Sequence, residues 1–406
     1  MNRGVVITGG GAVTPFGLGL EPVAEALRTS SPRFVEVDRG TGYHGSCGAR
    51  LAGLVGAPDL SSWLPVAVGR RMSPPSRLAV TAARMALRSA GLPEERTDQE
   101  TAVVLATAFG PASFSERLYR SVVKDGPESA SPFLFAECVA NAPAAQVAIT
   151  CGAAGPNITT VQREAGALVA LGRGAAEITS GRVVRALVGV VDELPPVAHG
   201  VLDRFRALAR ERAGLPEAPR PFDRRRNGFV ASEGATVLVL EEERAARDRG
   251  VRPLARLRAV GTAFDASASR VGWGTGVEPL RRGLLRVLDR ADRGPRDVSF
   301  VVSGASGSVA GDRLEAKLLC AAFGGGPLPP VLAPKSVTGE YGGGLLASLT
   351  IACESRPFGP TAGFREADPD LGLTPHMGGP LPSPRAVVAS SLAAGGAAVW
   401  AVLEAP

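Results

Sequence analysis

Five cysteines are the strongest candidate nucleophiles of this chain, and they are widely spaced. They are Cys47, Cys138, Cys151, Cys320 and Cys353. A reactive thiolate needs a nearby base or a helix N-terminus that lowers the pKa of the thiol. Cys151 precedes a Gly-Pro-Asn turn at 155–157 and has no histidine near it in the sequence. We therefore interpret Cys151 as a structural residue.

Metal and disulfide chemistry finds little support in the sequence. The cysteine count is odd and no Cys-x-x-Cys pair occurs, which argues against a disulfide framework and against a zinc site. The three histidines, His44, His199 and His376, lie far apart. We predict no metal site, and the cysteine pattern is typical of a protein of the reducing cytoplasm.

Nucleotide-binding motifs are also missing. Gly9, Gly10 and Gly11 follow the strand-like run at 5–7, but their spacing is not Gly-x-Gly-x-x-Gly. No Gly-x-x-x-x-Gly-Lys-Ser/Thr motif occurs, and no tyrosine is followed four residues later by the lysine that a short-chain dehydrogenase requires. We expect the three glycines to form a tight turn from a strand to a helix.

Length and composition limit the possible partners. A chain of 406 residues with 45% hydrophobic residues can bury a large core. No apolar run is long enough to span a bilayer, and the N-terminus lacks the apolar stretch of a signal peptide. The net charge of +6 comes almost wholly from arginine and could attract an acidic partner. Because these arginines are dispersed, we predict no binding to nucleic acid or membranes.

Short β-branched runs alternate with helical stretches in two successive rounds. The first round predicts strands at 5–7, 102–106, 186–191 and 235–240, with helices at 75–90 and 165–178. The second predicts strands at 254–260, 298–302 and within 385–400, with helices at 277–288 and 313–323. This alternation predicts an α/β fold with mixed, mostly parallel sheets covered on both faces. A charged join at 241–250 divides the chain into 1–250 and 251–406.

Several motifs, in order along the chain, resemble those of the β-ketoacyl synthases. The most specific are Arg220-Pro221-Phe222-Asp223, Asn227-Gly228-Phe229-Val230 with Glu233, and Lys335-Ser336-Val337-Thr338-Gly339. Further matches lie at 6–17, 71–77, 131–133 and 141–145. The resemblance covers about the full chain. It implies a thiolase-like, five-layer fold made of two similar βαβ halves, a ketosynthase-like N-terminal half and a ketosynthase-like C-terminal half.

In that family a cysteine takes an acyl group from a carrier protein, and two histidines support decarboxylation of a malonyl unit. The motifs place these three positions at Glu164, Gly304 and Glu340. The first lies seven residues after Asn157, the second lies eight residues before Asp312, and the third directly follows the Lys-Ser-Val-Thr-Gly motif. Glutamate does not exchange acyl groups as a thiolate does, glycine supplies no donor, and Glu340 would repel an enolate. The resemblance therefore implies that no catalytic residue is intact.

Other parts of the family's frame are retained. Lys335 and Glu233 stand where the family has them. The family's Gly-Phe-Gly-Gly gating loop corresponds to 391–396, where both phenylalanines are absent and the paired glycines remain. Its gating residues here are Leu392, Ala394, Gly395 and Gly396. Such a loop implies relaxed gating.

One subgroup of the family fits this pattern, the chain-length factor, or ketosynthase β-subunit, of type II polyketide synthases. Its members usually carry glutamine at the cysteine position, and the stretch at 164–171 resembles their sequence there. Glutamate at 164 is a departure that leaves room for a polyene or other reducing branch. The resemblance implies a heterodimer with an active ketosynthase subunit, whose acyl tunnel it shapes during polyketide elongation. It implies no cofactor on this chain, because the acyl groups are carried on the phosphopantetheine of an acyl carrier protein.

Two other functions stay open, and four residues are candidates for the tunnel. The chain could be a carrier-protein-dependent decarboxylase or acyltransferase that uses Glu164 as acid or base, or a homodimeric ketosynthase-like scaffold. In this fold the segment after the strand at 102–106 approaches the dimer interface, which makes its bulky apolar residues candidates for the tunnel or for ordinary core. They are Phe114, Leu118, Phe133 and Phe135. A buried Glu164 would need a partner, for which Arg163 is a candidate.

Overall fold

The structure is a computed structural model that describes residues 3–39, 48–95, 101–212 and 214–406. Cys47 and His44 lie outside the described residues. The described strands form one large sheet of eleven strands and one small sheet of three. The small sheet consists of β3 (Val35–Glu36), β4 (Leu51–Gly53) and β8 (Ala231–Ser232).

The large sheet contains two runs of five strands with the same topology. One run is β1 (Val5–Thr14), β9 (Gly234–Glu242), β7 (Arg185–Asp192), β5 (Thr101–Ala106) and β6 (Asn157–Thr160). The other is β10 (Ala255–Phe264), β14 (Ala397–Glu404), β13 (Val387–Leu392), β11 (Phe300–Ser303) and β12 (Val331–Leu332). Read outward from β1 or from β10, each run has two antiparallel pairings followed by two parallel pairings.

The two runs join where β1 pairs with β10, over the three residue pairs from Val5–Leu257 to Ile7–Ala255. The extra strand β2 (Gly17–Leu18) pairs with β1. The repeated topology confirms the prediction of two similar α/β halves. The exact residue at which the chain divides, which we placed at 250, stays a prediction.

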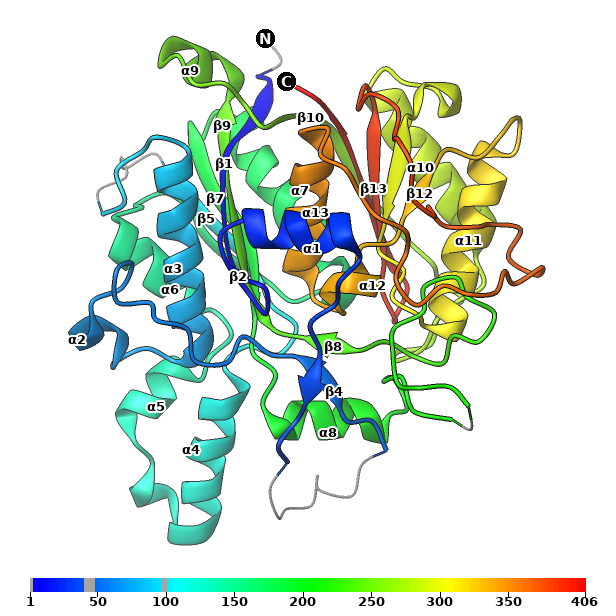
Figure 1. The fold of residues 1–406 in the computed structure, drawn as a ribbon. Helices are drawn as coiled ribbons and strands as arrows, with labels where there is room; N and C mark the ends of the chain where they lie inside the picture. Colours follow the sequence, from blue (N-terminus) through cyan, green and yellow to red (C-terminus); the bar gives the residue numbers. More distant parts are fainter. Residues whose placement is uncertain (1–2, 40–47, 96–100, 213) are drawn as a thin grey trace.

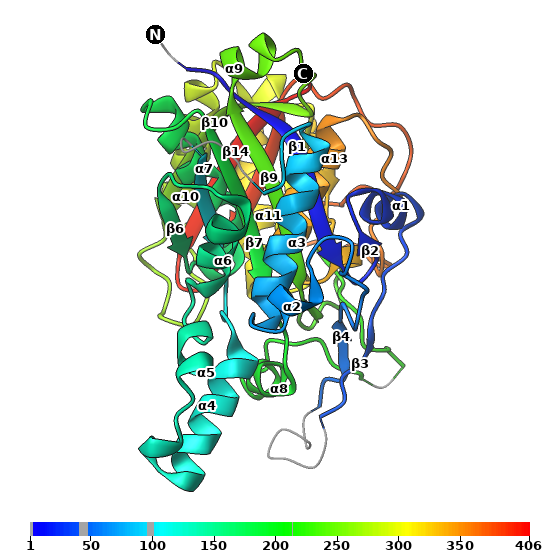
Figure 2. The ribbon, with the colours of Figure 1, turned by 90° about the vertical axis from the view of Figure 1, so that its left-hand side faces the viewer.

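Helices cover both faces of each half and give five layers (Figure 1). The outer helices of the first half are α3 (Pro74–Ser89) and α6 (Ala142–Cys151), which face the viewer in Figure 2. The central layer holds α7 (Gly166–Thr179) and α13 (Gly342–Cys353), and the other outer layer holds α10 (Val277–Arg290) and α11 (Val309–Phe323). Three separate clusters of buried apolar residues fill the spaces between these layers.

The remaining elements lie at the periphery. They are α1 (Glu21–Thr29), α2 (Val66–Gly69), α4 (Ala112–Asp125), α5 (Pro132–Glu137), α8 (Pro196–Arg204), α9 (Glu243–Asp248), α12 (Lys335–Thr338) and three short 3-10 helices, Pro127–Ser129, Arg163–Ala165 and Pro295–Asp297. The pair α4 and α5 projects away from the body in both views (Figures 1 and 2). Among the described helices, none combines the length and the apolar character that a membrane span requires.

The prediction of a tight turn at Gly9, Gly10 and Gly11 is wrong, because all three lie inside β1. A Cβ atom on Gly9 would come within 2.4 Å of the Ala86 carbonyl oxygen of α3. A Cβ atom on Gly11 would come within 2.2 Å of the Ala82 carbonyl oxygen. These glycines therefore permit close packing of α3 on the strand.

Candidate functional site

Two neighbouring cavities meet at Glu164, in the short turn Arg163–Ala165 that leads into α7. The larger cavity has a volume of about 430 Å³ and the smaller one about 10 Å³. Glu164 and Glu340 line both. The two glutamates come from separate elements, since Glu340 follows α12. They therefore stand between an open pocket and a space about the size of one water molecule.

The structure brings the three predicted positions together. Glu164, Gly304 and Glu340 all line the smaller cavity, along with Glu315 of α11. Gly304 directly follows β11, at the carboxyl end of that strand. Within the described part of the chain, no cysteine or histidine lines either cavity. The ionisable groups here are mainly carboxyl groups, which lack the nucleophilicity of a thiolate.

A buried lysine balances part of this acidity. Lys335 begins α12 and is fully buried, and its Nζ donates a hydrogen bond to Glu340 Oε1 at 2.5 Å. The second oxygen, Glu340 Oε2, is buried without a hydrogen-bond partner among the described residues, as is Glu164 Oε2. Lys335 thus compensates part of the negative charge of Glu340.

Burial changes the acidity of the site. It raises the pKa of Glu164 to about 7, and the negative charge of Glu340 contributes to that shift. Burial likewise raises the pKa of Glu315 to about 7. The pKa of Asp192, at the end of β7, rises to about 6 because its burial outweighs the hydrogen bonds that it accepts. Near neutral pH, Glu164 and Glu315 are therefore partly protonated.

The candidate pairing of Arg163 with Glu164 is wrong. No ion pair joins these two side chains in the part of the chain that the structure describes. Arg163 has a left-handed backbone with φ of 46°, and its Nη1 donates to the carbonyl oxygen of Ala394 at 3.1 Å. Ser391 Oγ donates to the backbone carbonyl of Glu164 at 2.7 Å. These contacts fasten the segment 391–396 to the turn that carries Glu164.

That segment occupies the place of the predicted gating loop. Leu392 lines the smaller cavity and Ala394 lines the larger one. Gly395 and Gly396 have φ of 96° and 98°, a region that favours glycine. The glycines are therefore needed for the turn between β13 and β14, and a role in gating stays a prediction.

Comparisons with known proteins place this chain in a family. The family described as "Beta-ketoacyl synthase, N-terminal domain" matches residues 2–246, and "Beta-ketoacyl synthase, C-terminal domain" matches residues 254–352. The chain belongs to the β-ketoacyl synthase family. This confirms the resemblance that the motifs indicated.

Individual relatives come from polyketide biosynthesis. The chain is 32% identical to the actinorhodin polyketide putative beta-ketoacyl synthase 2 of Streptomyces coelicolor, over 93% of this chain and 92% of the relative. It is 31% identical to the tetracenomycin polyketide synthase ketoacyl synthase beta subunit of Streptomyces glaucescens, over 91% and 90%. The solved structure of the ishigamide ketosynthase/chain length factor is 27% identical, covers 100% of both chains and superposes with a TM-score of 0.89. The thiolase-like fold is thereby confirmed.

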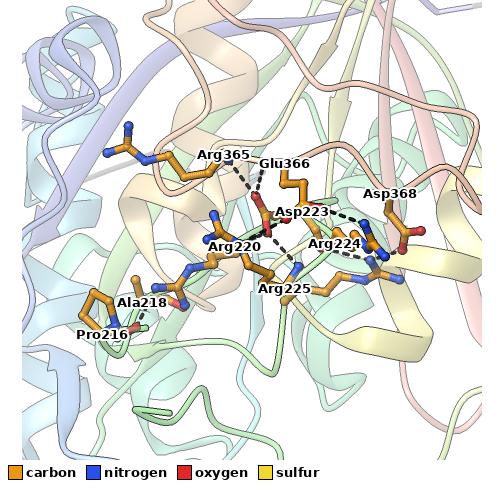
Figure 3. Close-up of polar contacts among 10 residues, drawn as sticks. Pro216, Ala218, Arg220, Asp223, Arg224, Arg225, Arg365, Glu366 and Asp368 are labelled. Atoms are coloured by element: carbon orange, nitrogen blue, oxygen red, sulfur yellow. Dashed lines mark hydrogen bonds and ion pairs between the residues drawn. The ribbon is translucent and has the colours of Figure 1, made fainter. Parts of the chain in front are cut away.

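The motif Arg220-Pro221-Phe222-Asp223 connects the two halves of the chain through hydrogen bonds (Figure 3). Asp223 accepts hydrogen bonds from the backbone N–H groups of Arg365 at 2.6 Å and Glu366 at 2.8 Å. The backbone N–H of Phe222 donates to Asp312 Oδ2 at 2.9 Å. Asp312 also accepts from the backbone of Gly307, at 3.2 Å. The motif therefore holds the loop between β11 and α11 that carries Gly304.

Glu233, the other retained residue, braces two loops. Its Oε1 accepts from the Val55 N–H at 2.9 Å and its Oε2 accepts from the Leu194 N–H at 2.8 Å.

Cys151 is fully buried at the end of α6, and burial raises the pKa of its thiol to about 12. Such a thiol stays protonated at neutral pH, which agrees with its interpretation as a structural residue.

None of the four predicted tunnel residues lines either cavity at Glu164. Phe114 and Leu118 lie on α4, buried against Leu134 of α5. Phe133 and Phe135 are 42% and 65% exposed on α5. The Phe114 and Phe133 rings pack edge to face with centroids 5.9 Å apart. A tunnel role for these residues would require a second subunit against this face, and it stays a proposal.

The sequence reasoning missed most of the larger pocket. Its apolar walls include Phe109, Leu202, Phe205 and Phe229. It also missed Asp192, which accepts from the Thr107 hydroxyl at 2.8 Å. An acid at the end of the apolar run of β7 was a usable signal. The aromatic residues lie in irregular segments with no periodic pattern, so the sequence offered no comparable signal for them.

Proposed function

We propose that this chain is the chain-length factor of a type II polyketide synthase, a non-catalytic subunit that pairs with an active ketosynthase. The observation that carries the proposal is the smaller cavity, which brings together Glu164, Gly304 and Glu340. These are the residues that the motifs predict at the three positions of the family's chemistry. Condensation requires a thiolate to hold the growing chain and donors for the developing enolate. A cavity with carboxylates in their place does neither.

An apolar face supports the pairing with a ketosynthase. The strand β6 is the last in its half of the sheet, and on its outer side no strand of the described residues pairs with it. Large apolar residues are also exposed on α6, which packs on β6, and on the projecting pair α4 and α5. They are Tyr119, Val123, Phe133, Phe135 and Ile149. An exposed strand edge and several exposed large apolar residues are typical of a subunit interface. We place the partner here, with Phe114 and Leu118 behind the interface as limits to the tunnel.

The partner chemistry follows from the relatives. The tetracenomycin beta subunit belongs to a polyketide synthase, and the ishigamide structure is that of a ketosynthase/chain length factor. For this chain we propose that the acyl groups arrive on the phosphopantetheine of an acyl carrier protein. No cofactor of its own is needed for that role.

Co-expression tests the proposal. The chain is produced with a co-encoded ketosynthase and carrier protein, and the complex is analysed by size exclusion with multi-angle light scattering. We expect a 1:1 complex that makes polyketide, while the chain alone leaves malonyl-carrier protein intact. Homodimers that persist beside the ketosynthase would favour a scaffold. Malonyl turnover by the chain alone, abolished in Glu164→Ala, would instead show a decarboxylase.

A further inference from the structure

The larger pocket combines apolar walls with acidic groups, which is an unusual pairing for a site whose expected ligand is an acyl chain. Its volume is about 430 Å³, and its lining includes exposed apolar residues, among them Phe109, Val201, Phe205 and Val271. Three carboxyl groups share this lining, those of Glu164, Asp192 and Glu340. Apolar walls favour an aliphatic or aromatic ligand body, so the acidic groups decide which polar end such a ligand carries.

Two of the three carboxyl groups have an oxygen in need of a donor. The Glu340 side chain is only 10% exposed, and Lys335 satisfies one of its oxygens. Glu340 Oε2 and Glu164 Oε2 have no hydrogen-bond partner among the described residues. Asp192 differs, because its Oδ1 accepts from Thr107 and from the backbone of Ala108. A ligand that donates hydrogen bonds would relieve the unpaired oxygens.

The acidic side chains at the pocket outnumber the basic side chains near it by one. Two positive groups lie near these acids. Arg163 lines the pocket and donates to a backbone carbonyl, and Lys335 is fully buried behind the lining, where it pairs with Glu340. Opposite them are the three carboxyl groups of this pocket, and Glu315 lines the smaller cavity next to it. When all three acids of the pocket are ionised, the balance is one negative charge. A carboxylate ligand would increase this imbalance, and a monovalent cation would remove it.

We propose that this pocket binds an apolar molecule bearing a protonated primary amine, whose ammonium group donates to Glu164 and Glu340. An ammonium supplies three donors and one positive charge, which suits two acceptors with unpaired oxygens. The alkyl part covers the aromatic walls and gains from leaving water. The site goes beyond the proposed chain-length role and does not depend on it.

The ionisation of Glu164 gives the proposal a second signature. Burial raises the pKa of Glu164 to about 7. Below that pH the protonated carboxyl group repels no anion and attracts no cation, and above it the carboxylate does both. The affinity for an alkylammonium ion therefore increases as the pH rises from 6 to 8, while the affinity for an alcohol of the same length changes little.

Isothermal titration of the full chain with octylamine, octanol and octanoate tests this site. At pH 8 we expect octylammonium to bind about tenfold more tightly than octanol, the usual effect of a charge-assisted hydrogen bond, and octanoate to bind most weakly. Glu164→Gln removes the preference for octylammonium and its pH dependence but keeps octanol binding, which serves as the control for folding. Phe205→Ser weakens the binding of both probes alike.

Three results would overturn the proposal. They are octanoate binding as tightly as octylammonium, a Glu164→Gln chain that keeps the full preference for the ammonium ion, and wild-type protein that binds none of the probes. Because these titrations contain no ketosynthase, their failure leaves the chain-length role standing. Conversely, failure of the co-expression experiment leaves the amine site untouched.

Discussion

The buried pair of Lys335 and Glu340 offers a direct test of how the altered site is held together. Lys335 is 0% exposed, and its Nζ lies 2.5 Å from Glu340 Oε1. Lys335→Met shortens the side chain by one heavy atom, keeps it unbranched and removes the charge. Glu340 then remains buried beside Glu164 with no positive partner. Breaking one side of such a pair costs about 3–5 kcal/mol, and we expect that loss in the free energy of unfolding.

Urea titration followed by tryptophan fluorescence measures this loss. The double variant with Lys335→Met and Glu340→Gln should recover part of the stability, because no unpaired charge remains. Arg224→Met is the matched control. It removes an ion pair to Glu366 whose side chains are 61% and 44% exposed, so we expect a change below about 1 kcal/mol. The reasoning is refuted if Lys335→Met costs no more stability than this control. It is also refuted if the losses measured for Lys335→Met alone and Glu340→Gln alone simply add in the double variant.

Three further predictions follow from the buried acid and from the apolar face. Burial raises the pKa of Glu315 from 4.5 to about 7, so its ionisation destabilises the folded state as the pH rises between these values, by on the order of 3 kcal/mol. Glu315→Gln should therefore gain stability relative to wild type between pH 4.5 and 7.5 in urea titrations, and parallel pH profiles would contradict this. In complex with a ketosynthase, Phe114→Ala or Leu118→Ala should lengthen the product seen by mass spectrometry. An unchanged product from both variants removes these residues from the tunnel. Phe133→Ser combined with Phe135→Ser should weaken the complex with the ketosynthase in size exclusion, and an unaffected complex would place the interface elsewhere.

Much of the fold could be predicted from local patterns. The apolar spacing at 75–90 predicted α3 because one face of that helix packs on the sheet, and the short β-branched run at 102–106 predicted β5. The helix α13 was not predicted. All of its residues are buried, so it has no polar face and no helical periodicity to detect.

The site, too, could be predicted from the sequence only in part. Fixed spacings from Asn157, Asp312 and the lysine motif predicted Glu164, Gly304 and Glu340, and the structure brings these residues around one cavity. The hydrogen bond from Phe222 to Asp312 holds one of the loops that set these spacings. The direction of a long side chain does not follow from spacing. Arg163 could equally have turned toward Glu164, and its actual partner, the Ala394 carbonyl, lies 231 residues away in the sequence.

The room for a side chain at Gly304, the position predicted for one of the family's histidines, can be tested directly. A Cβ atom there would lie 2.8 Å from the Ser390 carbonyl oxygen and 3.1 Å from Ser391 Cα, so the backbone of β13 leaves no room for a side chain. We expect Gly304→His to cost about 1–3 kcal/mol in the free energy of unfolding, as overpacking does. A glycine with open space around it, Gly326, provides the control, and Gly326→Ala should change stability by less than about 0.5 kcal/mol.

The same steric argument applies to a variant in which positions 164, 304 and 340 all carry the residues of the active family members. Glu164→Cys, Gly304→His and Glu340→His together return the family's side chains, but the histidine at 304 can enter only if the 390–391 backbone moves. Ser391 is tied to the Glu164 carbonyl at 2.7 Å, so that movement would also displace the new cysteine. We therefore expect the triple variant to form no condensation product with malonyl-carrier protein and an acyl donor, even where iodoacetamide labels the cysteine. Detectable condensation would show that the backbone still fits catalysis and that only the side chains had changed.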